Sequence, residues 1–210
     1  MGIFEEIRAA MVDGDSKQAV AAVSQGLADG IDAGTLLHEG LIAGMAEVGQ
    51  LYENGEIFVP EMLVAARAMN AALAVLKPHL VSEGVASSGK VAIGTTEGDL
   101  HDIGKNLVAM MLEGSGYEVV DLGVDVPAER FIEAIHNGAK VLAMSALLTT
   151  TMTNMQSAIE AITAAGLRDQ VRIIIGGAPI TKSYADEIGA DGYAEDASSA
   201  VRLVKEVLAA

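Results

Sequence analysis

Residues 90–116 read KVAIGTTEGDLHDIGKNLVAMMLEGSG, and this stretch passes from one kind of secondary structure to another. Its first part, Val91–Thr95, is an apolar run typical of a buried strand. A loop with two carboxylates and one histidine follows, at Asp99, His101 and Asp102. The helical run IGKNLVAMMLEG begins directly after this loop. The stretch therefore predicts a strand, a polar loop and a helix in succession, which is the repeating unit of a parallel α/β sheet.

The same alternation of strand and helix continues to the end of the chain. We expect strands at 90–95, 117–122, 140–145, 171–175 and 191–194. We expect helices between and after them at 103–114, 128–137, 152–165, 181–188 and 197–208. The pattern predicts an α/β domain over residues 90–210, with a doubly wound parallel sheet of five strands of the flavodoxin-like or Rossmann-like kind. Ligands of such sheets bind beyond the carboxyl ends of the strands.

Residues 1–81 differ from the rest, because every run in them is helical. We expect helices at 3–11, at 16–29, at 33–54 and from Pro60 until Pro78 closes the last one. Asp13, Asp15 and Asp32 are the expected caps. Four helices with short connections predict an N-terminal helical bundle. The small, polar segment SEGVASSG (82–89) predicts a linker between this bundle and the α/β domain.

The composition of the 210 residues excludes several classes of function. The formal charge of −16 argues against nucleic acid, whose phosphates would be repelled, although it also fits a merely solvated acidic surface. The absence of cysteine excludes thiolate metal sites and disulfides and fits a cytoplasmic location. No apolar run approaches the roughly 20 residues of a membrane span. The partners that we expect are proteins or small molecules.

Polar residues gather where three of the predicted strands end. Gly94–His101 follows the first strand, Ser145–Thr151 the third and Gly176–Pro179 the fourth. Asp99 lies two residues before His101, so it can accept the ring N–H and leave the other ring nitrogen free for a metal. One histidine does not hold a metal alone, whereas a macrocycle would supply four more ligands. Taken singly, each feature has a simpler explanation. His101 could be an incidental loop histidine, Gly176-Gly177 a tight turn and Thr149–Thr151 the cap of the next helix.

Three short motifs carry a resemblance to a known family. Asp99-x-His101-x-x-Gly104, Ser145-x-Leu147 and Gly176-Gly177 resemble the cobalamin-binding signature of methionine synthase and its relatives. The spacing agrees, since 40 residues (105–144) separate the first motif from the second and 28 residues (148–175) separate the second from the third. The phrases HDIGKN and VVDLGVDVP are also typical of this family.

The N-terminal half extends the resemblance. MAEVGQLYENGEIFVPEMLVAARAM (45–69) is similar to the helical cap of methionine synthase and of the small corrinoid proteins of methyltransferase systems. The chain resembles these corrinoid proteins over nearly its whole length. In that family the corrin lies between bundle and sheet, and its nucleotide tail runs into a groove of the α/β domain. A histidine replaces the nucleotide base on cobalt.

The resemblance implies a role for each motif residue. His101 would be the lower cobalt ligand, Asp99 its hydrogen-bond partner, and Ser145 would continue the relay. The cofactor-binding residues implied next to this set are Gly98, Asp102 and Ile103. Those implied to leave room for the nucleotide tail or to contact it are Thr95, Thr96, Gly104, Leu147, Thr149, Gly176, Gly177 and Ala178. The residues implied to cover the upper face are Tyr52, Phe58, Val59 and Met62, for which ordinary bundle packing is the alternative.

The function implied by the resemblance is that of a corrinoid methyl carrier. The chain would bind cobalamin or a related corrinoid with its base off and histidine on. It would take a methyl group from a substrate-specific methyltransferase and pass it to a second methyltransferase that acts on tetrahydrofolate, another pterin or a thiol. A reductive-activation protein is a third implied partner. We expect no catalysis by the chain alone, no nucleic acid and no membrane.

Three other functions share parts of the pattern. The B12-binding subunit of a mutase has the cobalamin motif, but it lacks this helical cap. A B12-dependent sensor combines a similar bundle with the same α/β domain, but it usually adds a DNA-binding module. A phosphoacceptor receiver domain needs an aspartate at the end of the third strand, where this chain has Ser145.

Overall fold

The computed structural model of the chain describes residues 2–83 and 87–209. The chain divides into two compact units, one made of Met1–Ser88 with Glu113–Gly116 and the other of Gly89–Leu112 with Tyr117–Ala210. Helix continues to Glu83 in the first part of the predicted linker 82–89. Residues 84–86 of that linker lie outside the described residues, so the linker stays a prediction.

The first unit contains the helices that the sequence predicts. They are α1 (Ile3–Val12), α2 (Ser16–Ala28), a third segment made of α3 (Ala33–Thr35), the π-helix η1 (Leu36–Ile42) and α4 (Ala43–Glu53), and α5 (Val59–Glu83). Two of the expected caps are confirmed. Asp15 accepts the N–H groups of Lys17 and Gln18, and Asp32 accepts that of Thr35. The π-helical turns inside the third segment were not expected, because apolar spacing alone does not separate π from α.

The prediction that Pro78 closes the last helix is wrong, because α5 runs through Pro78 to Glu83. Proline within a helix removes its own N–H and crowds one carbonyl, but it does not prevent the following residues from continuing the helix. The end of α5 is also tied down within its own unit. The Glu83 carboxylate accepts the N–H of Ala33 at 3.0 Å and 3.2 Å.

Among the described helices, one segment, Val59–Leu80, is long and apolar enough to cross a membrane by length and composition. The expectation that no apolar run approaches such a length is therefore wrong for α5. One such helix is weak evidence for a membrane span, since the core helix of a soluble protein has the same properties. Helix α5 contacts α1, α2 and α4 within its unit, and Met62, Ala66 and Met69 are fully buried. This packing accounts for part of its apolar character.

The second unit confirms the predicted doubly wound parallel sheet. Its strands are β1 (Lys90–Thr95), β2 (Glu118–Asp121), β3 (Val141–Ser145), β4 (Arg172–Gly176) and β5 (Gly192–Ala194). Its helices are α6 (Ile103–Gly114), α7 (Ala128–His136), α8 (Thr149–Ala164), the short 3₁₀-helix η2 (Arg168–Gln170), α9 (Lys182–Ile188) and α10 (Ala197–Ala209). The strand order is β2-β1-β3-β4-β5, with every pair parallel. The order reverses beside β1, which is where ligands bind in sheets of this kind.

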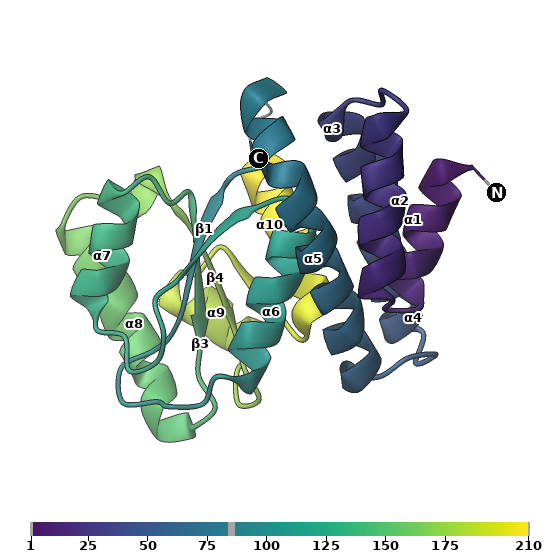
Figure 1. The fold of residues 1–210 in the computed structure, drawn as a ribbon. Coiled ribbons are helices and arrows are strands. Elements are labelled where there is room, and N and C mark those ends of the chain that lie inside the picture. The colour runs from purple at the N-terminus through teal and green to yellow at the C-terminus, as the bar shows by residue number, and fades with distance from the viewer. Residues whose placement is uncertain (1, 84–86, 210) are drawn as a thin grey trace. The chain divides into compact units, whose positions relative to one another are not determined.

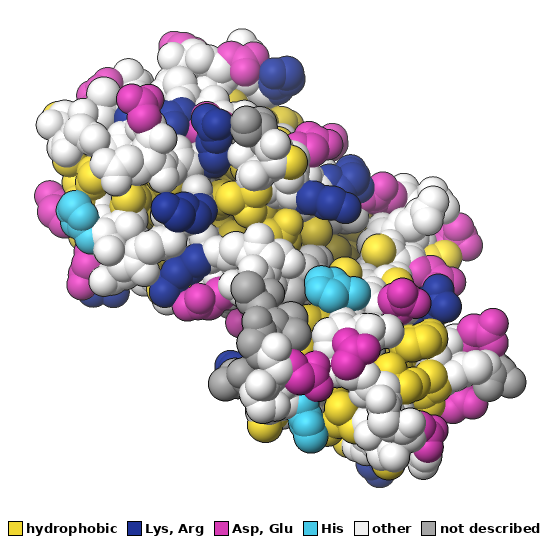
Figure 2. Space-filling view, turned by 90° about the horizontal axis from the view of Figure 1, so that it is seen from above, with side chains coloured by type: hydrophobic (Ala, Val, Ile, Leu, Met, Phe, Trp, Pro, Cys, Tyr) yellow, Lys and Arg dark blue, Asp and Glu magenta, His cyan; other side chains and the backbone are white. Residues whose placement is uncertain are grey.

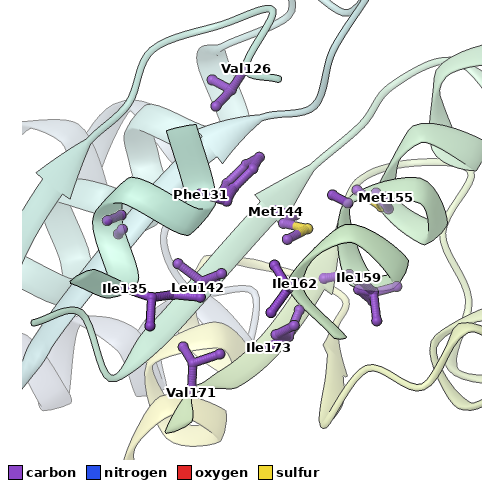
Figure 3. Close-up of a cluster of buried hydrophobic side chains, with 14 of the residues drawn as sticks. Val126, Phe131, Ile135, Leu142, Met144, Met155, Ile159, Ile162, Val171 and Ile173 are labelled. Atoms are coloured by element: carbon purple, nitrogen blue, oxygen red, sulfur yellow. The ribbon is translucent and has the colours of Figure 1, made fainter. Parts of the chain in front are cut away.

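Helices cover both faces of this sheet (Figure 1), and apolar side chains pack between each layer of helices and the strands. Val91 and Ile93 of β1 belong to a cluster with α6 and α10, whereas Ala92 between them belongs to a cluster with α7, α8 and α9. This alternation follows from the period of two residues along a strand. Figure 3 shows part of the larger cluster, with Phe131 and Ile135 of α7 and Met155, Ile159 and Ile162 of α8 beside Leu142 and Met144 of β3.

On the face shown in Figure 2, acidic side chains are scattered among basic and uncharged ones and form no single large patch. The net charge of −16 is therefore consistent here with a solvated surface, as the composition allowed.

Candidate functional site

The loop between β1 and α6 presents His101 at the carboxyl end of the sheet. The Nδ1 atom of His101 lies 2.7 Å from Oδ1 of Asp99, and the backbone N–H of His101 donates to the same oxygen at 3.0 Å. The histidine side chain is 51% exposed, whereas the aspartate is completely buried. A carboxylate only accepts, so Nδ1 carries the hydrogen and a neutral imidazole leaves a lone pair on Nε2. The predicted hydrogen bond between Asp99 and His101 is present. The free Nε2 atom of His101 is suited to bind a metal.

Asp99 is ionised in spite of its burial. Its second oxygen, Oδ2, accepts the N–H of Leu147 at 2.8 Å, the N–H of Leu148 at 3.3 Å and the hydroxyl of Thr151 at 2.7 Å. Burial alone would raise the pKa of the carboxyl group. The hydrogen bonds from Leu147, His101 and Thr151 outweigh burial and hold the pKa of Asp99 well below its usual range.

The hydroxyl that donates to Asp99 is that of Thr151. The role of Ser145 in continuing the relay stays a prediction. Ser145 is the last residue of β3 and contributes its carbonyl oxygen, which accepts the N–H of Thr96 at 2.9 Å. Thr151 lies in the first turn of α8, which begins at Thr149 and thus three residues earlier than expected. This turn brings Thr151 across to a carboxylate 52 residues away in the chain. The run Thr149–Thr151 is visible in the sequence, but the sequence alone does not show that Thr151 hydrogen-bonds to Asp99.

Replacing Thr151 by valine should lower the free energy of unfolding by about 1.5–3 kcal/mol, since a hydrogen bond to a charged group is lost in a buried place. The matched change Ser145→Ala should cost less than about 1 kcal/mol. Urea denaturation of the cofactor-free variants measures both values, and Thr151→Ser should restore most of the loss. An equal loss in the two variants would contradict the assignment of the Asp99 partner to Thr151.

Further hydrogen bonds fix the loop that carries His101. The hydroxyl of Thr95 donates to the carbonyl oxygen of His101 at 2.9 Å. Asp125, which follows β2, donates its N–H to the carbonyl oxygen of Asp99 at 2.9 Å and accepts the N–H of Gly98 at 2.7 Å. Within the described residues, Asp125 is the only non-glycine residue with positive φ, at 53°. Sequence reasoning missed this residue, although it lies in the phrase VVDLGVDVP.

The predicted contacts of the nucleotide tail fall into two groups. Thr95 and Thr96 are buried by protein in this structure, and the hydroxyl of Thr95 is used within the loop. Thr149 and Ala178 are exposed at the same end of the sheet. Contact of these residues with a ligand stays a prediction.

The glycines of the motifs are there for different physical reasons. A Cβ on Gly177, where φ is 126°, would collide with the carbonyl oxygen of Ala146, and one on Gly176 would lie 2.9 Å from the carbonyl oxygen of Ala194. Close approach of backbone therefore explains this pair without any ligand. A Cβ on Gly104 would meet nothing within 4 Å, and this residue has no positive φ. Nothing within the described chain requires glycine at this position, so it leaves room that a ligand could use.

Exposed apolar side chains lie on the same two loops as His101 and the backbone donors to Asp99. Leu100 and Ile103 flank His101 in the chain and are 70% and 81% exposed, and Leu147 and Leu148 are each 43% exposed. Asp102 beside them is exposed and accepts a hydrogen bond from Asn106. Exposed apolar side chains on the loops at this end of the sheet, together with one free imidazole nitrogen, fit a large, mostly apolar ligand that brings its own metal.

The four predicted covering residues lie in the helical unit. Phe58 is 66% exposed, and Tyr52 and Val59 are partly exposed. Met62 is completely buried, which favours ordinary packing for this residue.

Comparisons with known proteins give relatives along nearly the whole chain. Two family models match, each described as a B12 binding domain, one over residues 89–202 and the other over residues 3–77. A trimethylamine corrinoid protein of Methanosarcina barkeri is 46% identical, with 98% of this chain and 96% of that protein covered. A corrinoid protein of Desulfitobacterium hafniense is 41% identical, with 99% and 98% covered. The methanol:cobalamin methyltransferase complex of M. barkeri is similar in structure, with a TM-score of 0.86 and 30% identity over 99% of this chain and 80% of that chain.

Proposed function

The chain belongs to the B12-binding corrinoid proteins of methyltransferase systems, and from this membership we propose that it carries a methyl group on a corrinoid whose cobalt is coordinated by His101. The observation that carries the proposal is the pairing of a half-exposed histidine with a buried, ionised aspartate. Asp99 holds the hydrogen on Nδ1 and so directs the lone pair of Nε2 outward. In this arrangement His101 takes the place of the nucleotide base of the corrinoid.

A bound corrinoid supplies the cobalt on which the methyl group is carried. The residues of the chain bind, orient and exchange a proton. His101 would hold the cobalt through Nε2, and where it did not, Nε2 could accept a proton while Asp99 kept the hydrogen at Nδ1. Thr151 has two acceptors within reach, because its oxygen lies 2.7 Å from Oδ2 of Asp99 and 3.0 Å from the carbonyl oxygen of Leu148. Its one hydrogen can point to either acceptor.

The methyl donor that we propose is a methylamine, because relatives of 44–46% identity over nearly the full chain are trimethylamine and dimethylamine corrinoid proteins. A substrate-specific methyltransferase would load the protein. A second methyltransferase, acting on tetrahydrofolate, another pterin or a thiol, would unload it, and a reductive-activation protein would restore it. The chain alone would not complete the reaction, and its place would be the cytoplasm.

Electron paramagnetic resonance tests the coordination. The protein is produced with ¹⁵N-labelled histidine, loaded with cobalamin and reduced to the Co(II) state. We expect coupling of the cobalt to one labelled nitrogen. Coupling only to the nitrogen of the cofactor's own base would refute coordination by His101.

A second experiment tests the methyl donor. The loaded protein is methylated by a methylamine-specific methyltransferase and, for comparison, by a methanol-specific one. A preference for methanol would refute the methylamine proposal.

Gly104→Ala should separate ligand binding from folding. The added methyl group meets no protein atom, so the free energy of unfolding should change by less than about 0.5 kcal/mol. Cobalamin affinity should fall about tenfold, as overpacking against a ligand costs on the order of 1 kcal/mol or more. Gly177→Ala is the contrasting control and should destabilise the cofactor-free protein strongly. Unchanged cobalamin affinity in Gly104→Ala would show that the ligand does not approach this glycine.

A further inference from the structure

Lys105 is a buried cation that the proposed mechanism does not use. Among the described residues it is the one lysine or arginine that is buried, with 3% of its surface exposed. It lies in the first turn of α6, where the helix dipole disfavours positive charge. Its ammonium group donates to both carboxylate oxygens of Asp121, at the end of β2, and to Oδ1 of Asn106, each at 2.6 Å. All three of its donors are therefore satisfied at a place that would otherwise be unfavourable for a lysine.

One path of hydrogen bonds leads from Lys105 to the C-terminal side of His101. Asn106 accepts from Lys105 through Oδ1, and its Nδ2 donates to Oδ2 of Asp102 at 3.0 Å. The backbone N–H of Asn106 also donates to the carbonyl oxygen of Asp102 at 2.7 Å. Asp102 is the next residue after His101, so this path fixes the point at which the loop enters α6.

A second path leads from Lys105 to the carbonyl group of His101. Oδ1 of Asp121 accepts from Lys105 and from the N–H of Gly123, the latter at 2.9 Å. The carbonyl oxygen of Gly123 accepts the N–H of Thr95 at 3.0 Å. The hydroxyl of Thr95 then donates to the carbonyl oxygen of His101 at 2.9 Å. The two paths form a closed ring that contains the backbone of His101, with Lys105 where they meet.

We infer that Lys105, through its ion pair with Asp121, is a positioning residue that sets where His101 presents its free nitrogen. The inference rests on the proposed coordination of cobalt by His101. A histidine that is held to one metal atom must be placed accurately, and residues that orient a ligand typically change metal affinity about 10–100-fold when they are replaced. Asp99 fixes the rotation of the imidazole ring, whereas the ring of hydrogen bonds through Lys105 fixes the backbone that carries it.

The experiment compares Lys105→Met with Lys90→Met. Lys90 pairs with Glu118 at 2.9 Å, and this partly exposed ion pair joins β1 to β2 at the opposite end of the same strands. We expect Lys105→Met to bind cobalamin about tenfold more weakly. At saturating cobalamin, a smaller share of its Co(II) signal should show coupling to ¹⁵N-histidine. In the cofactor-free protein, the N–H of His101 should exchange faster with solvent. Lys90→Met should match the wild type in all three measurements.

Asn106→Ala provides a second variant in case Lys105→Met does not fold. It removes the side-chain hydrogen bonds of Asn106 to Lys105 and Asp102 but leaves the ion pair of Lys105 with Asp121 in place, so it should show the same changes in weaker form. A merely structural role would lower the melting temperature but leave full histidine coupling in the folded, saturated protein, and this result overturns the inference. If the wild type itself shows no histidine coupling, the proposed coordination fails and the inference fails with it. Full coupling in the wild type and in both site variants overturns the inference alone.

Discussion

His101→Ala is expected to abolish coupling of the cobalt to a protein nitrogen and to weaken cobalamin binding by more than about 100-fold. Loss of a direct ligand should exceed the effect of replacing a residue that only orients one, which is about 10–100-fold. The fold should survive, because the side chain is 51% exposed and belongs to neither apolar cluster of the α/β unit. Cobalamin titration and electron paramagnetic resonance of the Co(II) form measure the two effects.

His136→Ala is the matched control for this experiment. His136 is also an exposed histidine of the α/β unit, but it ends α7, which leads into the amino end of β3. Its removal should change neither cobalamin affinity nor the spectrum. Cobalt that still couples to a labelled protein nitrogen in His101→Ala would exclude His101 as the ligand. Equal affinities of the two variants for cobalamin would show that coordination contributes little to binding.

Asp99→Asn is expected to lower the free energy of unfolding by about 2–4 kcal/mol at neutral pH, because one accepting oxygen becomes an amide that faces hydrogen-bond donors in a buried place. The same change should weaken the hold on Nδ1 of His101 and reduce cobalamin affinity about 10–100-fold. Asp186→Asn is the control, since Asp186 is exposed and pairs with the exposed Lys182 at 3.2 Å in the same helix. Urea denaturation and cobalamin titration measure the changes.

The effect of Asp99→Asn on stability should depend on pH. The pKa of Asp99 in the folded protein lies well below its ordinary value of 3.8. The ionised carboxylate therefore contributes its full stabilisation above about pH 4, and this contribution is lost as the pH falls below that value toward the folded pKa. The difference in unfolding free energy between wild type and Asp99→Asn should thus be largest at neutral pH and smaller at pH 3. A difference that stays constant from pH 7 to pH 3 would contradict a depressed pKa for this group.

Much of the architecture is local, and the sequence by itself determined it. The helix at 103–114 and the strand at 90–95 have the bounds that apolar spacing predicts. The pair of Asp99 and His101 was also predictable, since the two residues are two positions apart in one loop and one can reach the other without help from the rest of the chain. The order of the motifs along the chain sufficed to place them together, because carboxyl ends of parallel strands meet at one edge.

Only the tertiary structure decided which group meets which at that edge. Thr151 reaches Asp99, because the first turn of α8 brings its hydroxyl across a separation of 52 residues. Gly177 is required by the carbonyl of Ala146 on the neighbouring loop, whereas the sequence suggested a ligand. Lys105 of α6 forms its ion pair with Asp121 at the end of β2, and the apolar periodicity of the helix does not predict this contact. Periodicity states which face of an element is apolar, but hydrogen bonds need a donor and an acceptor about 3 Å apart, and that distance follows from how the packed elements meet.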